Sequence, residues 1–250
     1  MDLYEAFALE PGAIVAAVGG GGKTSLVYAL AQAAADRGLS AIVTTTTKFT
    51  RPRGITMPAI VETSGLDPSQ GLGEVLTPGA VFVATTGAVE RGRLLGFEPG
   101  SIARLSELGA GLIAVEADGS AHRPFKAPGA HEPVIPACAT DVVVCVGLEV
   151  LGRELCDTWV HRSELAGALA ESPPGAPVTA DLVLRVLLHP EGGGKGVPPR
   201  ARLHALLNNP ASPEHEKLAV HLGQRLVYGG FRRVVVASAH RPGDIRAVLC

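Results

Sequence analysis

The sequence of 250 residues has few aromatic side chains and no excess of positive charge. Phe, Tyr and Trp make up 4% of it, and 22 Lys and Arg stand against 24 Asp and Glu, for a formal net charge of -2 at pH 7. Proteins that bind nucleic acid through its phosphates carry a basic surface, and those that bind single strands add aromatic stacking platforms. The composition therefore argues against a nucleic acid partner.

Cysteine is also scarce, and no two cysteines have the C-x-x-C spacing that is typical of structural zinc sites. Disulfide frameworks are characteristic of small secreted proteins, whereas this chain is long and its first residues lack the basic and apolar regions of a signal peptide. We therefore expect reduced thiols and a cytoplasmic protein. The cysteines are Cys138, Cys145, Cys156 and Cys250.

Long hydrophobic runs are missing too. The longest, residues 142–148, lies between Asp141 and Glu149 and is far shorter than the roughly 20 apolar residues of a membrane-spanning helix. No membrane association is predicted. Hydrophobic residues still make up 46% of the chain, which is enough for a large core, so we expect a single domain over residues 1–250.

Short apolar segments alternate with amphipathic ones along the chain. Strands that are apolar throughout and separated by helices are typical of a parallel sheet covered on both faces. We therefore predict an α/β fold with about seven or eight strands in one doubly wound, mostly parallel sheet. The predicted strands are residues 13–18, 41–46, 81–84, 112–116, 142–146, 203–208 and 234–238, and the predicted helices are residues 23–37, 101–108, 163–169, 179–188 and 213–228.

Two stretches interrupt this alternation. Residues 51–78 contain Pro and Gly without clear periodicity, and we interpret them as an insertion in the domain. Residues 191–200 contain a Gly-Lys pair at Lys195, but no Ser or Thr follows and prolines come soon after. This favours a surface loop over a second phosphate site.

The strongest motif lies between the first predicted strand and the first predicted helix. Residues 17–24 read Ala-Val-Gly-Gly-Gly-Gly-Lys-Thr, which matches a phosphate-binding P-loop except that Ala17 replaces its first glycine. Glycines let successive N–H groups curl around a phosphate, and the helix N-terminus adds a positive field. Lys23 would neutralise the terminal phosphates and Thr24 would hold Mg²⁺. We predict a P-loop NTPase-like three-layer sandwich; the alternative is a Gly-rich turn of a Rossmann-type domain.

An acidic pair ends another predicted strand. Glu116 and Asp118 lie at the carboxyl end of residues 112–116, which is where open α/β sheets bind ligands. Either acid could hold Mg²⁺ with Thr24 or orient an attacking water, and the N–H of Gly119 could reach a γ-phosphate. The alternative is a turn with solvated acids.

Residues 44–48, Thr-Thr-Thr-Thr-Lys, end the second predicted strand. Four β-branched residues favour a strand by themselves. Their hydroxyls could equally reach a metal or a γ-phosphate, and Lys48 could meet an anion, so the sequence leaves both interpretations open.

Two further strand ends resemble the N-K-x-D and S-A motifs of GTPases. Asn208 matches the Asn of the first motif, and Ser238 with Ala239 matches the second. Ala211 stands where the Asp that reads guanine would be. ATP and GTP therefore both stay candidates.

The loop after Gly119 carries several basic residues and histidines. Its basic side chains could bind an anionic substrate or a partner, Arg123 above all because a guanidinium suits phosphate recognition. His131 and Glu132 could join a histidine in a metal site, and the pair at His161 is a weaker candidate for anion binding. The alternative is a proline-braced surface loop with solvated charges. The substrate or partner residues predicted here are His122, Arg123 and Lys126.

These segments together resemble the YqeC family. The resemblance is carried by residues 19–24, 44–48 and 115–120, and by the run Arg-Pro-Phe-Lys-Ala-Pro at 123–128 that continues as His-Glu-Pro-Val-Ile-Pro at 131–136. It implies an accessory protein of selenium-dependent molybdenum hydroxylases, with such an enzyme as client.

The strand-end Glu-x-x-Gly at residues 116–119 is also similar to that of nickel-metallochaperone GTPases. Those proteins often carry a lysine early in the P-loop, where this chain has Val18. A homodimer stays open, but a lysine donated across it is not supported.

The leading hypothesis is thus a Mg²⁺-dependent P-loop protein that hydrolyses ATP or GTP. A kinase that phosphorylates a small metabolite and a nucleotide-binding scaffold without turnover are the rivals. The predicted catalytic residues are Lys23, Glu116 and Asp118, and the predicted Mg²⁺ ligands are Thr24, Glu116 and Asp118. The predicted nucleotide-binding residues are Gly19, Gly20, Gly21, Gly22, Lys23, Thr24, Ser25, Gly119, Asn208 and Ser238.

Overall fold

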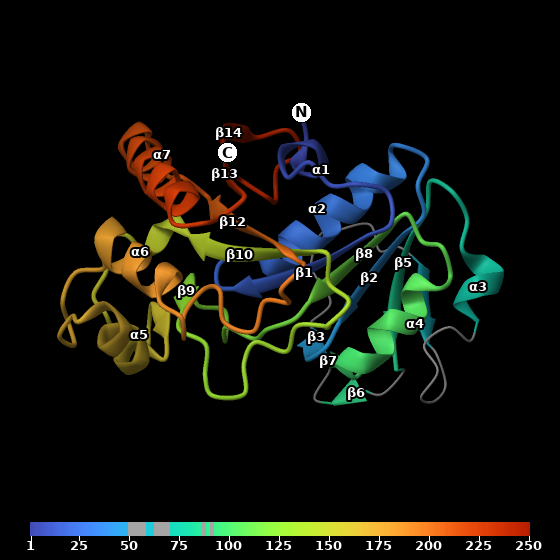
Figure 1. Cartoon of the computed structure of the whole chain (residues 1–250), viewed down its shortest axis with the longest axis horizontal. Helices are drawn as coiled ribbons and strands as arrows, with labels where there is room; N and C mark the ends of the chain where they lie inside the picture. Colours follow the sequence, from blue (N-terminus) through green and yellow to red (C-terminus); the bar gives the residue numbers. More distant parts are fainter. Residues whose placement is uncertain (50–58, 63–70, 87–88, 91–92) are drawn as a thin grey trace.

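The computed structural model describes residues 1–49, 59–62, 71–86, 89–90 and 93–250. Its centre is a twisted sheet in which nine strands of the described residues lie in the order β14-β13-β12-β10-β1-β8-β2-β5-β4 (Figure 1). Every neighbouring pair is parallel except the edge pair of β13 and β14. The predicted α/β fold with a mostly parallel sheet is confirmed.

The strands of this sheet are β1 (Ala13–Gly19), β2 (Ala41–Thr45), β4 (Ala59–Glu62), β5 (Val81–Thr85), β8 (Leu112–Glu116), β10 (Asp141–Gly147), β12 (Arg202–Asn208), β13 (Arg233–Ala237) and β14 (Ile245–Leu249). Two small sheets hold β3 (Lys48–Phe49), β6 (Val89–Glu90) and β7 (Arg93–Leu95), and β9 (Phe125–Lys126) with β11 (Val160–His161). The helices are α1 (Leu3–Ala6), α2 (Lys23–Ala35), α3 (Leu72–Val75), α4 (Ile102–Ser106), α5 (Ser163–Ala170), α6 (Ala180–Leu188) and α7 (Pro213–Tyr228), with 3-10 turns η1 (Pro99–Ser101) and η2 (Leu148–Val150).

The sheet separates two hydrophobic cores. Successive side chains of a strand point to opposite faces, so β1 contributes Ile14 and Ala16 to one core and Val15 and Ala17 to the other. Helices α1 and α2 pack in the second core, whereas α4, α6 and α7 pack in the first. Because both faces are covered, the central strands are apolar throughout, as their sequence indicated.

Side-chain caps define where the two C-terminal helices begin. Thr179 accepts a hydrogen bond from the N–H of Leu182 at the start of α6, and Ser212 accepts one from the N–H of His215 at the start of α7. Pro213 occupies the first turn of α7, where its missing N–H costs nothing. These local signals explain why both helices lie where the sequence placed them.

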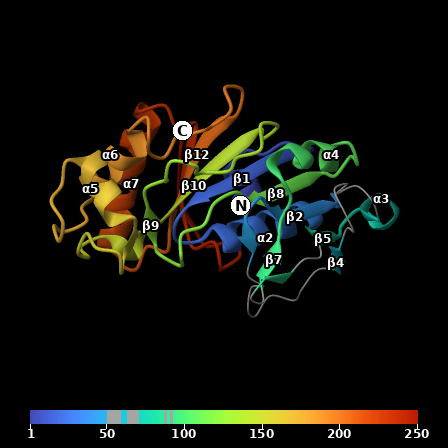
Figure 2. The same ribbon diagram turned by 90° about the horizontal axis from the view of Figure 1, so that it is seen from below.

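The chain changes direction at the centre of the sheet. After β1 it builds β2, β4, β5 and β8 on one side, and then it crosses to β10, β12 and β13 on the other. Figure 2 shows α5, α6 and α7 gathered at one end of the molecule and α3 and α4 at the other. Open α/β sheets bind ligands at such a switch point, at the carboxyl ends of the strands.

Two strands of the sheet were not among those predicted. β14 closes one edge as the antiparallel neighbour of β13, and its short sequence is only partly buried. β4 lies at the other edge, within the insertion predicted for residues 51–78; the rest of that segment up to residue 70 lies outside the described residues. None of the described helices combines the length and apolar character that crossing a bilayer requires.

Candidate functional site

The Gly-rich loop joins β1 directly to α2 at the carboxyl edge of the sheet. Gly21 has a φ of +70°, and a Cβ atom there would lie 2.5 Å from the backbone nitrogen of Gly147. A Cβ atom on Gly20 would lie 2.7 Å from the carbonyl oxygen of Arg123. Both positions therefore require glycine, because neighbouring backbone encloses the loop on two sides.

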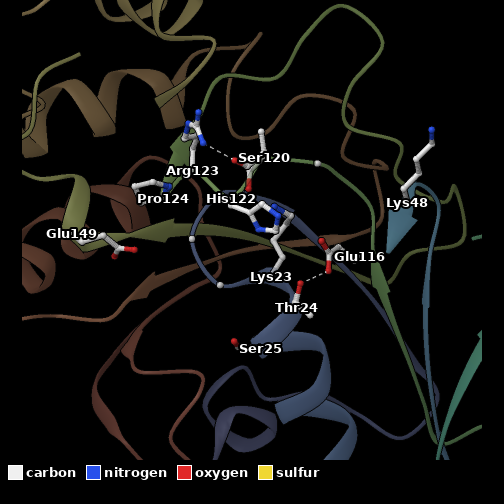
Figure 3. A pocket seen from close by; sticks show the side chains of 14 residues that line it. Lys23, Thr24, Ser25, Lys48, Glu116, Ser120, His122, Arg123, Pro124 and Glu149 are labelled. Atoms are coloured by element: carbon white, nitrogen blue, oxygen red, sulfur yellow. Dashed lines mark hydrogen bonds between the residues drawn. The ribbon is translucent and has the colours of Figure 1, made fainter. Parts of the chain in front are cut away.

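The side chain of Lys23, at the end of this loop, reaches back to Gly19 at its start. The side-chain Nζ donates a hydrogen bond of 2.7 Å to the carbonyl oxygen of Gly19, and the residue is only 4% exposed. Figure 3 shows the lysine in the middle of the cavity above the loop. The loop therefore holds one positive charge over a ring of backbone groups at a helix N-terminus, an arrangement that attracts anions.

Thr24 faces the strand next to β1. Its hydroxyl donates a hydrogen bond of 2.7 Å to Oε2 of Glu116, which ends β8 (Figure 3). Burial raises the pKa of Glu116 above its ordinary value, against the opposing effects of Lys23 and of the Thr24 hydrogen bond. A hydroxyl and a carboxylate are hard oxygen ligands, so this pair fits Mg²⁺ chemically.

Asp118 turns away from the cavity. It is 2% exposed, its Oδ2 accepts a hydrogen bond of 3.0 Å from the N–H of Gly19, and its Oδ1 forms an ion pair with Lys126. The two acids that the sequence groups together therefore have different surroundings. Glu116 accepts a hydrogen bond from Thr24 at the start of α2 and lines the cavity, whereas Asp118 accepts a hydrogen bond from the N–H of Gly19 and does not line it.

Four charged side chains of alternating sign run from the loop to α5, and we call them the ion chain: Asp118, Lys126, Glu132 and Arg162. The buried ammonium of Lys126 contacts Asp118 and lies 2.6 Å from Glu132. Arg162 binds both oxygens of Glu132, at 2.7 and 2.8 Å. These two cations lower the pKa of Glu132 to about 2 against the effect of burial, which is the largest single contribution.

A cavity of about 320 Å³ opens over the loop. Its wall combines the loop, the end of β8, the segment after β8, Lys48 of β3, and Glu149 in the turn η2 that follows β10 (Figure 3). This volume is within the range of small-molecule sites. The lining residues are Gly21, Gly22, Lys23, Thr24, Ser25, Lys48, Glu116, Gly119, Ser120, Ala121, His122, Arg123, Pro124 and Glu149.

The three residues predicted to contact a substrate or partner have different positions. His122 lines the cavity, lies beside Lys23 in Figure 3 and has a φ of +60°. Arg123 also lines it, but its guanidinium donates hydrogen bonds to the carbonyl oxygens of Ala121 and Asp157. Lys126 is buried in the ion chain. The backbone of the stretch after Gly119 thus passes over the P-loop, while the charged groups of Arg123 and Lys126 are occupied by contacts within the protein.

Asn208 connects the P-loop to the next strand end. Its amide nitrogen donates a hydrogen bond of 2.9 Å to the carbonyl oxygen of Gly21, and its Oδ1 accepts one of 2.9 Å from the N–H of Ala239. Ser238 precedes Ala239 at the end of β13, and its N–H donates to the carbonyl oxygen of Asp244. Both predicted residues thus lie at the carboxyl edge without lining the cavity.

The threonines at the end of β2 and directly after it bind the backbone of neighbouring segments. The hydroxyl of Thr44 donates to Ala84, that of Thr45 to Glu116, and that of Thr46 to Val134, each time to the carbonyl oxygen. These hydroxyls therefore stabilise the sheet edge, while Lys48 lines the cavity. Lys195 lies in a turn away from it, where its Nζ contacts Gly129 and Glu191.

Glu149 is a charged lining residue that was not among the predicted site residues. Glu149 follows β10, in the turn η2. It could have been found as the acid that follows the longest apolar run, at the same edge as Glu116. The metal site considered for His131 and Glu132 has no support, because no group of three His, Cys, Asp or Glu side chains suited to a metal occurs among the described residues.

Comparisons with known proteins identify the family. The sequence model of the YqeC protein family matches residues 15–164. An uncharacterized protein YqeC of Escherichia coli (strain K12) is 34% identical over 191 residues, which cover 76% of this chain and 73% of that protein. No solved structure matches significantly. The chain therefore belongs to the YqeC family, and the matched region contains the P-loop, β8, the ion chain and η2.

Proposed function

We propose that this member of the YqeC family binds a nucleoside triphosphate with Mg²⁺ and hydrolyses it. The observation that carries the proposal is the closed loop of residues 19–24, in which Lys23 reaches back over the backbone while Thr24 meets Glu116. Lys23 would bind the terminal phosphates, and the loop N–H groups would bind their oxygens.

The carboxylates receive different roles in this proposal. Glu116 lies in the cavity, so we assign it to Mg²⁺ together with Thr24. A bound Mg²⁺ would neutralise negative charge on the phosphates. Asp118 accepts a hydrogen bond from the N–H of Gly19 and does not line the cavity, so we assign to it the role of stabilising the conformation of the loop.

The biological part of the proposal rests on the family resemblance. We propose that turnover serves the maturation of a selenium-dependent molybdenum hydroxylase, as the resemblance implied. The segment over the P-loop, residues 119–124, would be the part of the chain that responds to the nucleotide, because it lines the same cavity as Lys23.

Calorimetric titration with Mg²⁺-ATP and Mg²⁺-GTP tests the site. Lys23→Ala should abolish binding, whereas Lys195→Ala is a matched control because it removes the lysine of the chain's other Gly-Lys pair, away from the cavity. Equal affinity of wild type and Lys23→Ala for both nucleotides would refute the P-loop function.

Phosphate release separates the proposed hydrolase from its rivals. Hydrolysis predicts inorganic phosphate in water without an added acceptor. A kinase would require a phosphorylated second product, and a scaffold would bind nucleotide without any release. Either of these outcomes would replace the hydrolytic part of the proposal and leave the binding site intact.

A further inference from the structure

The cavity wall contains a carboxylate oxygen that lacks a partner. Oε2 of Glu149 is shielded from solvent and has no hydrogen-bond partner among the described residues, although the side chain lines the cavity. We propose that Glu149 binds the ribose hydroxyls of the nucleotide and makes the site selective for ribonucleotides. This inference rests on the proposed triphosphate site and assigns its nucleoside side.

The backbone fixes this carboxylate against the P-loop. Gly147, two residues earlier, touches Gly21 of the loop, and its N–H donates a hydrogen bond of 2.8 Å to the carbonyl oxygen of Pro124. A Cβ atom on Gly147 would lie 2.7 Å from Oε2 of Glu149, so the side chain folds back over this glycine. The carboxylate is therefore held at the loop edge and does not extend into solvent.

The chemistry of a carboxylate selects the part of the nucleotide that it can meet. A buried acceptor without a donor is unfavourable, and a ligand with a suitable donor removes this penalty. Phosphate oxygens offer no donor and repel a carboxylate. Along a nucleoside triphosphate, the ribose hydroxyls are the first donors after the phosphates, and they are the groups that Glu149 can bind.

The position of Glu149 in the sheet agrees with this assignment. Figure 3 shows Glu149 and Glu116 on opposite sides of Lys23. Glu116 ends β8 on one side of β1, and Glu149 follows β10 on the other, the side on which β12 and β13 continue the sheet. With the terminal phosphates and Mg²⁺ at Glu116, the nucleotide leaves the loop towards β10, and its ribose comes next to Glu149.

Three probes test the assignment by titration: a Mg²⁺-ribonucleoside triphosphate, its 2′,3′-dideoxy analogue, and inorganic tripolyphosphate. Wild type should bind the ribonucleotide about tenfold or more tightly than the dideoxy analogue. Glu149→Ala should bind the ribonucleotide and the dideoxy analogue equally well and keep its affinity for tripolyphosphate. The preference of Glu149→Gln for the ribonucleotide should lie between those of wild type and Glu149→Ala. Glu107→Gln, which changes an exposed acid at the end of α4, is the control for loss of charge and should behave as wild type.

The outcomes separate this inference from the function on which it rests. A Glu149→Ala protein that keeps the wild-type ratio of ribonucleotide to dideoxynucleotide affinity overturns the ribose assignment alone. An equal gain in affinity for all three probes also overturns it, because Glu149 would then only repel phosphate. If Lys23→Ala binds tripolyphosphate as well as wild type does, the triphosphate site fails and the ribose assignment fails with it. Retained tripolyphosphate binding by Glu149→Ala shows that the variant is folded.

Discussion

At the scale of single residues, the candidate site consists mainly of backbone groups of the P-loop. Several of the side chains around it form hydrogen bonds to the main chain. Asn208 is an example, because both ends of its amide are occupied by the main chain of Gly21 and Ala239. A side chain used in this way determines the path of the backbone around the site. The same holds for Arg123, whose donors meet carbonyl oxygens. Residue type alone therefore predicts a site but does not assign each role.

Base selectivity is the first prediction at this scale. Since Ala211 offers no carboxylate to guanine, GTP should be preferred over ATP by less than about 2 kcal/mol, roughly thirtyfold. Competition binding measures the ratio. Ala211→Asp should shift it towards GTP. A wild-type preference for GTP of a thousandfold or more would mean that another residue reads guanine and that the interpretation of residues 208–211 is wrong.

At the scale of elements, the ion chain connects the P-loop to α5. Asp118 holds Gly19, and Arg162 precedes the first residue of α5. Between them, Lys126 and Glu132 come from residues 120–136, the part of the chain that follows β8. In a chain of alternating charges of this kind the inner members, Lys126 and Glu132, each have two oppositely charged partners, so removal of one member weakens the compensation of its neighbours.

The second prediction concerns the stability of this chain against acid. The pKa of Glu132 is lowered from 4.5 to about 2 in the folded protein. Its ionised form therefore contributes stability above about pH 4.5, and this contribution is lost as the pH falls towards 2. Glu132→Gln should lower the free energy of unfolding by about 1–3 kcal/mol at pH 7, with a smaller deficit below pH 4.5.

Denaturant unfolding at pH 7, 4.5 and 3 measures this deficit. Glu191→Gln is the control, because the carboxylate of Glu191 pairs with Lys195 and is 64% exposed, so its loss should change stability by less than about 1 kcal/mol. A Glu132→Gln deficit of the same size at every pH would show that packing rather than charge carries the effect.

The third prediction concerns the segment at residues 120–136. Its backbone touches Gly20, and its Lys126 joins the ion chain, so a ligand in the P-loop has two routes by which to affect it. Hydrogen exchange of this segment should differ between a non-hydrolysable triphosphate and a diphosphate. Identical exchange in both states, with the P-loop protected, would make the segment a fixed wall of the cavity and favour the kinase or scaffold alternatives.

The elements differ in how well the sequence predicted them. Helix α7 lies over residues 213–228, as predicted, because Ser212 and Pro213 specify its start locally. β14 was missed, because an edge strand that is partly buried lacks the continuous apolar pattern of the central strands. Lys126 was predicted to contact a substrate or partner, yet it is buried in the ion chain. Its partners lie up to eight residues away along a loop, and such tertiary pairing leaves no periodic pattern.

At the scale of the whole molecule, the central strand of the sheet carries the loop. β1 is hydrogen-bonded to β8 and β10, and these neighbours supply Glu116 and lead to Glu149. The site is therefore complete only when strands from both halves of the chain have paired. A ligand that binds it should stabilise the folded molecule as a unit, because the unfolded chain cannot form the cavity.

Thermal unfolding gives the last prediction. A Mg²⁺-nucleotide at 100 times its Kd should add about 2.7 kcal/mol, which for a chain of this size raises Tm by roughly 5–10 °C. Chelation of Mg²⁺ should remove much of the shift, because Thr24 and Glu116 would then face the phosphates without a cation between them. Lys23→Ala should abolish the shift, whereas Lys195→Ala should keep it. An equal rise in the Tm of Lys23→Ala would place nucleotide binding elsewhere on the molecule, since that variant lacks the charge above the loop.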